Sequence, residues 1–230
     1  RMILRQRRDL KKLRRLAQTR LRDLPAGRKV VYFALQTEPE QALNVLSPDH
    51  TNQLATAVEL ALSLPADALL AVKEHPYEVG RRTPGFYETL KEIPNIAFIH
   101  PDEPGLDMIA HADMVAVITS SAGYEAAVMG KQVLHFGRYG HALDLPHVHQ
   151  MMGFADMRRI PALLADDSAE LVERRKRDGA RYMLALKEFG LNMSSFAAHG
   201  RKERPNRAEL AAIVENLLRT ISSEELKLRA

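Results

Sequence analysis

Short apolar runs alternate with helix-like segments between about residue 29 and residue 136. Continuous apolar runs, which are typical of parallel strands covered on both faces, occur at 29–35, 68–72, 95–99, 115–118 and 133–136. Helix-like segments between them begin near Pro48, Phe86, Leu106 and Ser121. Strands that alternate with helices in this way predict an α/β fold, a Rossmann-like doubly wound parallel sheet.

The loops that follow these strands carry most of the candidate chemistry. Right-handed crossovers place such loops at the carboxyl edge of a parallel sheet, where ligands bind. The polar residues that the sequence places there are Glu38, Glu40, Lys73, His75, Ser120, Ser121 and Glu125. We therefore expect these residues, although distant in sequence, to line one cleft.

A run of small polar residues after the central strand opens a helix that Gly130 ends. A helix in this position is an anion site, because its free N–H groups and positive dipole end point at the ligand. Ser120 and Ser121 would add hydroxyl donors, and the small Gly123 would let a ligand approach the backbone. Glu125, one helical turn after Ser121, would accept from sugar hydroxyls. The alternative is that the serines only cap the helix and that Glu125 is solvated.

Residues 2–24 combine helical apolar spacing with a basic opposite face, so we expect a helix that continues to Leu24. Residues 1–28 carry most of the surplus positive charge of the chain. Their charged residues are Arg1, Arg5, Arg7, Arg8, Lys11, Lys12, Arg14, Arg15, Arg20, Arg22 and Arg28 against Asp9 and Asp23. Such a helix packs on the rest of the protein, lies on anionic lipid, or binds nucleic acid. Packing is favoured because charge runs are usually solvated surface, and nucleic acid is not expected because aromatic residues and recognition motifs are absent.

The pattern predicts three parts: the basic helix and linker at 1–28, the sheet domain at 29–153, and a helical part at 154–230 that packs on it. In the last part, Ser168 begins a long helix that Gly190 ends, and 207–221 forms a final amphipathic helix. Because residue 1 is Arg and not Met, we expect the chain to be a piece of a longer protein.

The composition excludes several classes of protein. The 230 residues include no cysteine, which excludes disulfides and thiolate metal sites. No apolar run is long enough to cross a bilayer and no secretory signal is present, so we expect a cytoplasmic protein, with peripheral attachment to the inner face of the membrane left open. Histidines at 135, 141, 147 and 149 suggest zinc, but without a clear third ligand set we expect no metal or other cofactor.

Three ordered motifs resemble those of the bacterial capsular polysaccharide biosynthesis proteins. They are Y-F-A-L-Q-T-E-P-E at 32–40, V-K-E-H-P at 72–76 and T-S-S-A-G-Y-E-A-A-V-M-G-K-Q-V at 119–133, followed by F-G at 136–137. The resemblance covers about residues 29–149 and implies the carboxyl-terminal, donor-binding half of a GT-B glycosyltransferase. Similar enzymes, including Kdo-transferase and sialyltransferase groups, hold the phosphate of a CMP-sugar with a His-Pro motif and a serine pair.

The resemblance also implies roles for individual residues. His75 and Pro76 match the first motif, Ser120 and Ser121 match the second, and Glu125 occupies the position where GT-B enzymes often bind the ribose or nucleotide. The implied function is glycosyl transfer from a nucleotide sugar to a glycan or glycolipid acceptor. CDP-glycerol glycerophosphotransferases and non-hydrolysing sugar-nucleotide epimerases have a similar arrangement of motifs, so both remain alternative functions. A non-catalytic Rossmann-like module is a third alternative.

In such a transfer, negative charge builds on the leaving phosphate, and His75, the serine hydroxyls and the helix amides would stabilise it. Lys73 would add positive charge, although lysines at strand ends are more often surface residues. A general base must take the proton of the acceptor hydroxyl. In GT-B enzymes it usually comes from the amino-terminal domain; within this chain Glu38 or Glu40 is the candidate, unless both are simply solvated.

Overall fold

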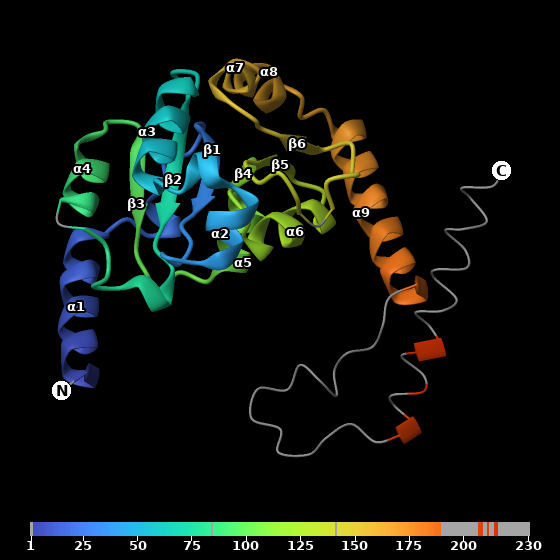
Figure 1. The fold of residues 1–230 in the computed structure, drawn as a ribbon. Helices are drawn as coiled ribbons and strands as arrows, with labels where there is room; N and C mark the ends of the chain where they lie inside the picture. The colour runs from blue at the N-terminus through green and yellow to red at the C-terminus, as the bar shows by residue number, and fades with distance from the viewer. Residues whose placement is uncertain are drawn as a thin grey trace. The chain divides into compact units, whose positions relative to one another are not determined.

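The computed structural model describes residues 2–83, 85–140 and 142–189, together with residues 207, 208, 211, 214 and 215. Within these residues, strands form one parallel sheet in the order β3-β2-β1-β4-β5-β6 (Figure 1). The strands are β1 (Lys29–Ala34), β2 (Ala68–Lys73), β3 (Ile96–Ile99), β4 (Met114–Val117), β5 (Gln132–His135) and β6 (Val148–Gln150). The predicted doubly wound α/β fold and its strands are confirmed, and β6 is an additional edge strand.

Helices connect β1 to β2, β2 to β3, β3 to β4 and β4 to β5. The connections are α2 (Gln41–Leu46), η2 (Pro48–His50) and α3 (Gln53–Ser63) after β1, η3 (Pro76–Glu78) and α4 (Phe86–Glu92) after β2, α5 (Gly105–His111) after β3, and α6 (Ser121–Val128) after β4. After β6 come α7 (Phe154–Met157), α8 (Ile160–Ala165) and α9 (Ala169–Phe189). The short helix α2 lies between the loop at 36–40 and Pro48, in a segment for which no helix was predicted.

Both faces of the sheet are buried. On one face, Val31 and Phe33 of β1 and alternate residues of neighbouring strands join a core with Leu60 of α3, Leu90 of α4 and Ile160 of α8. The other face is covered by α5 and α6, which lie side by side (Figure 1). Burial on two faces explains why the strands appear in the sequence as continuous apolar runs.

The basic helix α1 (Met2–Leu16) packs on the sheet domain. Leu13 is 2% exposed, and both Leu13 and Ala17 belong to the main core. The helix was expected to continue to Leu24, but the chain becomes extended at Thr19, which pairs in parallel with Ile99 at the edge of β3. The favoured packing interpretation is therefore confirmed, and only the length of the helix is wrong.

Gly123 lets α6 lie close against β4. A Cβ atom at this position would lie 2.5 Å from Val117 Cγ2. Gly123 is itself buried, so its missing side chain makes room for the strand. This contact gives Gly123 a packing role in addition to the ligand role predicted from the sequence.

Gly123→Ala is therefore expected to lower the free energy of unfolding by about 1–3 kcal/mol, because it overpacks α6 against β4. Gly105→Ala is the matched control, since no atom lies within 4 Å of the Cβ position at the start of α5. Urea unfolding of the two variants measures the difference. Equal stability would mean that α6 moves away from Val117 without cost.

The domain boundary predicted after residue 153 stays a prediction. Residues 1–180 form one compact unit and 181–230 another. Within the first unit, the beginning of α9 packs closely on the end of α6. A Cβ atom at Gly130 would lie 2.6 Å from the backbone nitrogen of Lys176. In the predicted helix at 207–221, the described residues 207, 208, 211, 214 and 215 are helical. The rest of that helix, like Gly190, lies outside the described residues.

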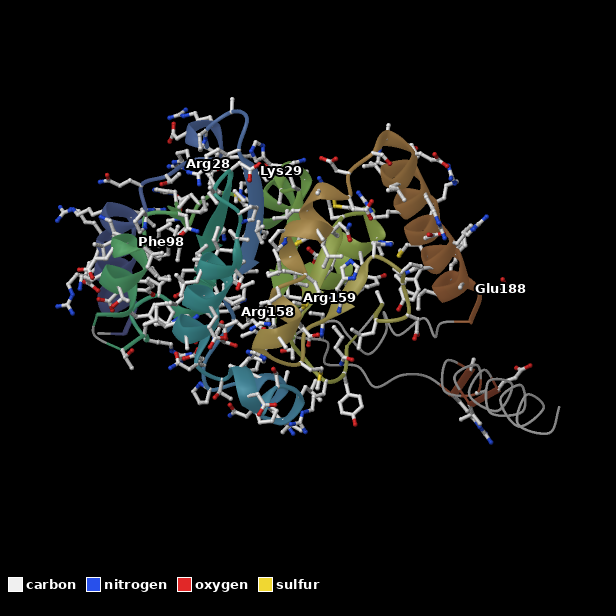
Figure 2. The ribbon with its side chains drawn as sticks, turned by 90° about the horizontal axis from the view of Figure 1, so that it is seen from above. Arg28, Lys29, Phe98, Arg158, Arg159 and Glu188 are labelled. Carbon is white, nitrogen blue, oxygen red and sulfur yellow. The ribbon has the colours of Figure 1, made fainter. Side chains whose placement is uncertain are left out.

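Lys29, the first residue of β1 (Figure 2), forms ion pairs at the amino edge of the sheet. Its Nζ lies 3.2 Å from Asp113 Oδ1 and also pairs with Asp167. A cavity of about 280 Å³ at this edge is lined by His111 and by residues of α8 and α9. No residue predicted to bind a ligand lines that cavity, so the candidate chemistry lies at the opposite edge.

Candidate functional site

The carboxyl edge brings together the loops that follow β2, β1 and β4, which are neighbours in that spatial order. These loops carry His75, Glu38 and Ser121 respectively. Because neighbouring strands lie about 4.8 Å apart, the ends of β2 and β4 are separated by roughly 10 Å. The sheet continues from β1 to β2 on one side and from β4 to β5 on the other, so its topological switch point lies between β1 and β4. The predicted convergence of these loops on one edge is confirmed.

Ser120 caps α6, whereas Ser121 is the exposed serine of the pair. Ser120 Oγ accepts from the Ala122 N–H at 3.3 Å, and the Ser120 carbonyl accepts from the Gly123 N–H at 3.1 Å. These bonds use two amides that the anion-site prediction assigns to a ligand. Ser121 Oγ lies 3.5 Å from Glu125 Oε1, which confirms that the two residues share one helical face. The turn therefore offers a ligand mainly the Ser121 hydroxyl and the positive end of the helix dipole.

His75 precedes η3 and holds its ring by a local hydrogen bond. Its Nδ1 accepts from the Tyr77 N–H at 3.3 Å, which places the proton of a neutral ring on Nε2. Nε2 has no hydrogen-bond partner in the part of the chain that the structure describes. Pro76 occupies the first position of η3, where a missing N–H is tolerated. The half-exposed ring of His75 thus offers an N–H donor.

Lys73, the last residue of β2, is buried, which disfavours the alternative that it is an ordinary surface lysine. It is only 8% exposed, and its ammonium group has no hydrogen bond or ion pair among the described residues. Val72 faces the main core, so strand alternation places Lys73 on the opposite face, which carries α5 and α6. Burial lowers the pKa of Lys73, and the charges of Glu74, Asp102 and Glu103 oppose this shift. An ammonium group without a close partner is suited to an anionic ligand.

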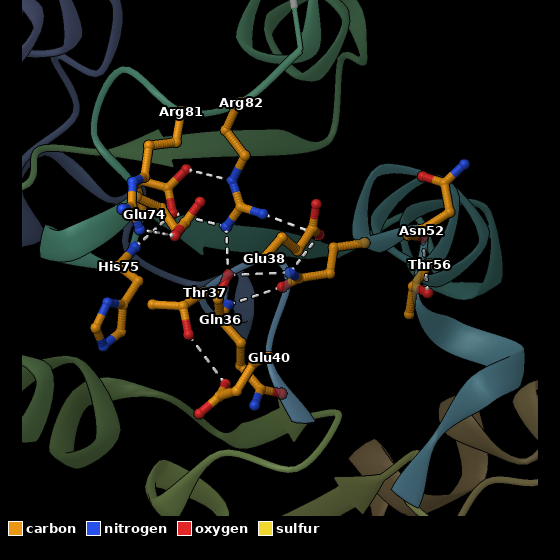
Figure 3. A network of polar contacts seen from close by, with 12 residues as sticks. Gln36, Thr37, Glu38, Glu40, Asn52, Thr56, Glu74, His75, Arg81 and Arg82 are labelled. Atoms are coloured by element: carbon orange, nitrogen blue, oxygen red, sulfur yellow. Dashed lines mark hydrogen bonds and ion pairs between the residues drawn. The ribbon is translucent and has the colours of Figure 1, made fainter. Parts of the chain in front are cut away.

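The structure reveals a buried ion pair that the sequence analysis does not identify. The Arg82 guanidinium donates to both carboxylate oxygens of Glu74 at 2.8 Å, and these side chains are 2% and 1% exposed (Figure 3). Tyr87 donates its hydroxyl to Glu74 Oε2 at 2.9 Å, and burial together with the Glu74 charge raises the pKa of Tyr87. Glu74 Oε1 also accepts from the His75 N–H at 2.6 Å. The ion pair therefore fixes the backbone of His75, while the His75 ring points away from the Glu74 carboxylate (Figure 3).

The two glutamates predicted as catalytic have different surroundings. Glu38 lies 2.9 Å from Arg82 Nη1 and accepts a hydrogen bond from the Gln53 amide. Glu40 accepts from the Thr37 hydroxyl at 3.0 Å and immediately precedes α2. Glu38 therefore belongs to the polar network around Arg82 (Figure 3), whereas the contacts of Glu40 are local.

A protein-family model for capsule polysaccharide biosynthesis proteins matches residues 2–144, which is more than half of the chain. The chain belongs to this family. The matched region of this capsule-synthesis family protein runs from α1 to the loop after β5 and contains every residue predicted to bind the donor. A search of curated protein sequences gave no match.

Solved structures with a similar fold include the beta Kdo 2,7 transferase KpsC of Thermosulfurimonas dismutans, with 17% identity over 78% of this chain and a TM-score of 0.45. Others are the wall teichoic acid polymerase TagF (12% identity over 95% of this chain, TM-score 0.44) and the spinosyn rhamnosyltransferase SpnG complexed with thymidine diphosphate (13% over 71%, TM-score 0.47). The chain spans 62%, 48% and 45% of these three proteins. At these identities the likeness concerns the fold alone.

Two of the histidines that suggested zinc have other partners in this capsule-synthesis family protein. The ring of His147 hydrogen-bonds the Ala127 carbonyl at 2.8 Å, and that of His149 bonds Gln132 at 2.6 Å. Burial lowers the pKa of His149 to about 4. Residue 141 lies outside the described residues, and among those described no group of three or more potential ligands surrounds a metal position.

The outer face of α1 remains strongly basic. Arg8, Lys11, Lys12 and Arg15 are exposed, while Arg14 pairs with Asp102 at 2.9 Å. In the part of the chain that the structure describes, every helix is too short or too polar to span a bilayer. Attachment of α1 to anionic lipid stays a prediction, and so does the absence of nucleic-acid binding.

Proposed function

We propose that this chain is the donor-binding part of a glycosyltransferase that takes a nucleotide-activated sugar at the carboxyl edge of its sheet. The observation that carries the proposal is the placement of His75 and Ser121 on loops that flank β1 beside the switch point. One loop presents an imidazole N–H, and the other presents a hydroxyl at a helix N-terminus. Donors that converge from separate strands suit a phosphate group better than an uncharged ligand.

In the proposed reaction, the bond between the anomeric carbon and the phosphate oxygen breaks, and its electron pair stays on that oxygen. The acceptor hydroxyl forms the new bond to the anomeric carbon and gives its proton to a general base. Nε2–H of His75 and the Ser121 hydroxyl donate to the leaving phosphate, while the ammonium of Lys73 balances its charge. Glu125 would accept from the ribose hydroxyls.

The base is proposed separately, since the chain spans only part of the solved proteins it resembles. Glu40 is the better candidate within the chain, because Glu38 is already paired with Arg82 and Gln53. A base from outside these 230 residues is the alternative. We propose a glycan or glycolipid as the acceptor, in keeping with the capsule-synthesis family.

The donor is proposed to be a CMP-sugar, on the strength of the His-Pro motif and the serine pair. Calorimetry of the full chain with CMP, CDP and UDP tests this directly. We expect cytidine-selective binding, and we expect Ser121→Ala to weaken CMP binding by roughly tenfold or more, because it removes a hydrogen bond to a charged phosphate. Ser168→Ala is the matched control, since the Ser168 hydroxyl accepts from the Leu171 N–H in the first turn of α9 and lies outside the proposed site.

The alternatives predict different results in the same titrations. Tighter binding of CDP than of CMP would favour a CDP-glycerol type of donor, and preference for UDP would favour an epimerase-like site. Absence of binding to all of these nucleotides would contradict the proposal and favour a non-catalytic module. Unchanged CMP affinity in Ser121→Ala would remove that hydroxyl from the phosphate site.

A further inference from the structure

Gln36, the second residue after β1, is held on both its backbone and its side chain. The Gln53 amide accepts from the Gln36 N–H at 2.7 Å and donates to the Gln36 carbonyl at 3.0 Å. The Gln36 side chain in turn accepts from the Thr119 N–H at 2.7 Å and donates to the Thr119 hydroxyl at 2.8 Å. Gln36 is only 5% exposed, so it has little access to water as an alternative partner.

The same residue is joined to the loop of His75. Arg82 donates to the Gln36 carbonyl at 2.6 Å and, through the same nitrogen, to Glu74 at 2.8 Å (Figure 3). Glu74 then accepts from the His75 N–H. A continuous chain of hydrogen bonds therefore runs from the backbone of His75 through Glu74, Arg82 and Gln36 to Thr119, the residue before Ser120.

We propose that Gln36 is a positioning residue that holds the His75 loop and the Ser120–Ser121 turn at a fixed separation for one phosphate group. This inference rests on the proposed function and adds to it, because neither His75 nor Ser121 is contacted by Gln36 itself. When two loops are already held at the right distance, no free energy is lost in ordering these loops as the ligand binds. The two hydrogen bonds between the Gln36 side chain and Thr119 set the position of the serine turn across the switch point.

Gln36→Met, which keeps the length of the side chain but removes its amide, tests the inference. We expect CMP affinity to fall roughly tenfold, as for loss of a buried hydrogen-bonded contact. Thr119→Val removes the hydroxyl partner and should weaken CMP binding in the same direction, whereas Thr119→Ser keeps the hydroxyl and should bind like the original chain. Melting temperatures of all variants show whether each is folded at the temperature of the titration.

A double-mutant cycle separates positioning from general stability. If Gln36 acts through the serine turn, adding Ser121→Ala to Gln36→Met should cost much less affinity than Ser121→Ala costs alone. The inference would be overturned if the two substitutions lowered CMP affinity by independent factors that multiply in the double variant. Wild-type affinity in a folded Gln36→Met variant would overturn it as well.

A second readout does not depend on nucleotide binding. In amide NMR spectra, Gln36→Met should shift the resonances of both His75 and Ser121, and should speed hydrogen exchange at the Thr119 N–H. Shifts confined to one loop would overturn the coupling even if CMP binds. Failure of CMP to bind the unmodified chain, with both loops shifting in the variant, would instead count against the proposed function alone.

Discussion

Arg82→Ala is expected to lower the free energy of unfolding by about 3–5 kcal/mol, because it leaves the Glu74 carboxylate buried without its partner. Both side chains are almost fully inaccessible, and the pair is bidentate at 2.8 Å. For a chain of 230 residues, such a loss corresponds to a fall in melting temperature of roughly 10 °C. Thermal and urea unfolding measure it.

Arg138→Ala is the matched control for this variant. Arg138 pairs with Asp49 at 3.0 Å, but the two side chains are 50% and 60% exposed, so the loss should stay below about 1 kcal/mol. Adding Glu74→Gln to Arg82→Ala should recover part of the stability, since the unpaired buried charge is then removed. Similar small losses for Arg82→Ala and Arg138→Ala would show that the buried pair does not hold this loop.

His75→Ala is expected to slow cleavage of the proposed donor by roughly 10²-fold or more, the usual loss when one donor to a developing negative charge is removed. The reason is the orientation of the ring: Nδ1 is occupied by the Tyr77 N–H, which leaves Nε2–H for the phosphate. The measurement is the initial rate of nucleotide release from a CMP-sugar by the full chain. His111→Ala, an exposed histidine at the end of α5, should leave the rate unchanged. A His75→Ala variant with the original rate would exclude His75 from the mechanism.

The sheet could be predicted from the sequence because its strands are buried on two faces. Continuous apolar runs fixed the positions of β1 to β5, and right-handed crossovers fixed the edge at which their loops meet. The edge strand β6 (Val148–Gln150) was missed as a strand of the sheet, since its residues change from buried to exposed within three positions. The end of α1 was wrong because a tertiary contact, Thr19 with Ile99, overrides helical spacing.

The candidate site was predicted without Arg82 and Gln36, which join its loops. Alternation at the end of β2 turns Lys73 toward the face of α5 and α6 and sends Glu74 into the network with Arg82. In the sequence, Arg82 follows Arg81 in a polar segment and looks like surface charge. Only the structure shows that Glu74, inside the V-K-E-H-P motif, is buried and therefore needs a cation as partner. Gln36 gave no signal in the sequence either, because a neutral amide carries no charge pattern.

The most direct test of the account is an experimental structure of the chain with CMP bound. The account predicts that the phosphate lies at the carboxyl edge, within hydrogen-bond distance of both His75 Nε2 and the Ser121 hydroxyl. A nucleotide in the cavity at the amino edge, or a phosphate that touches only one of these two groups, would contradict it.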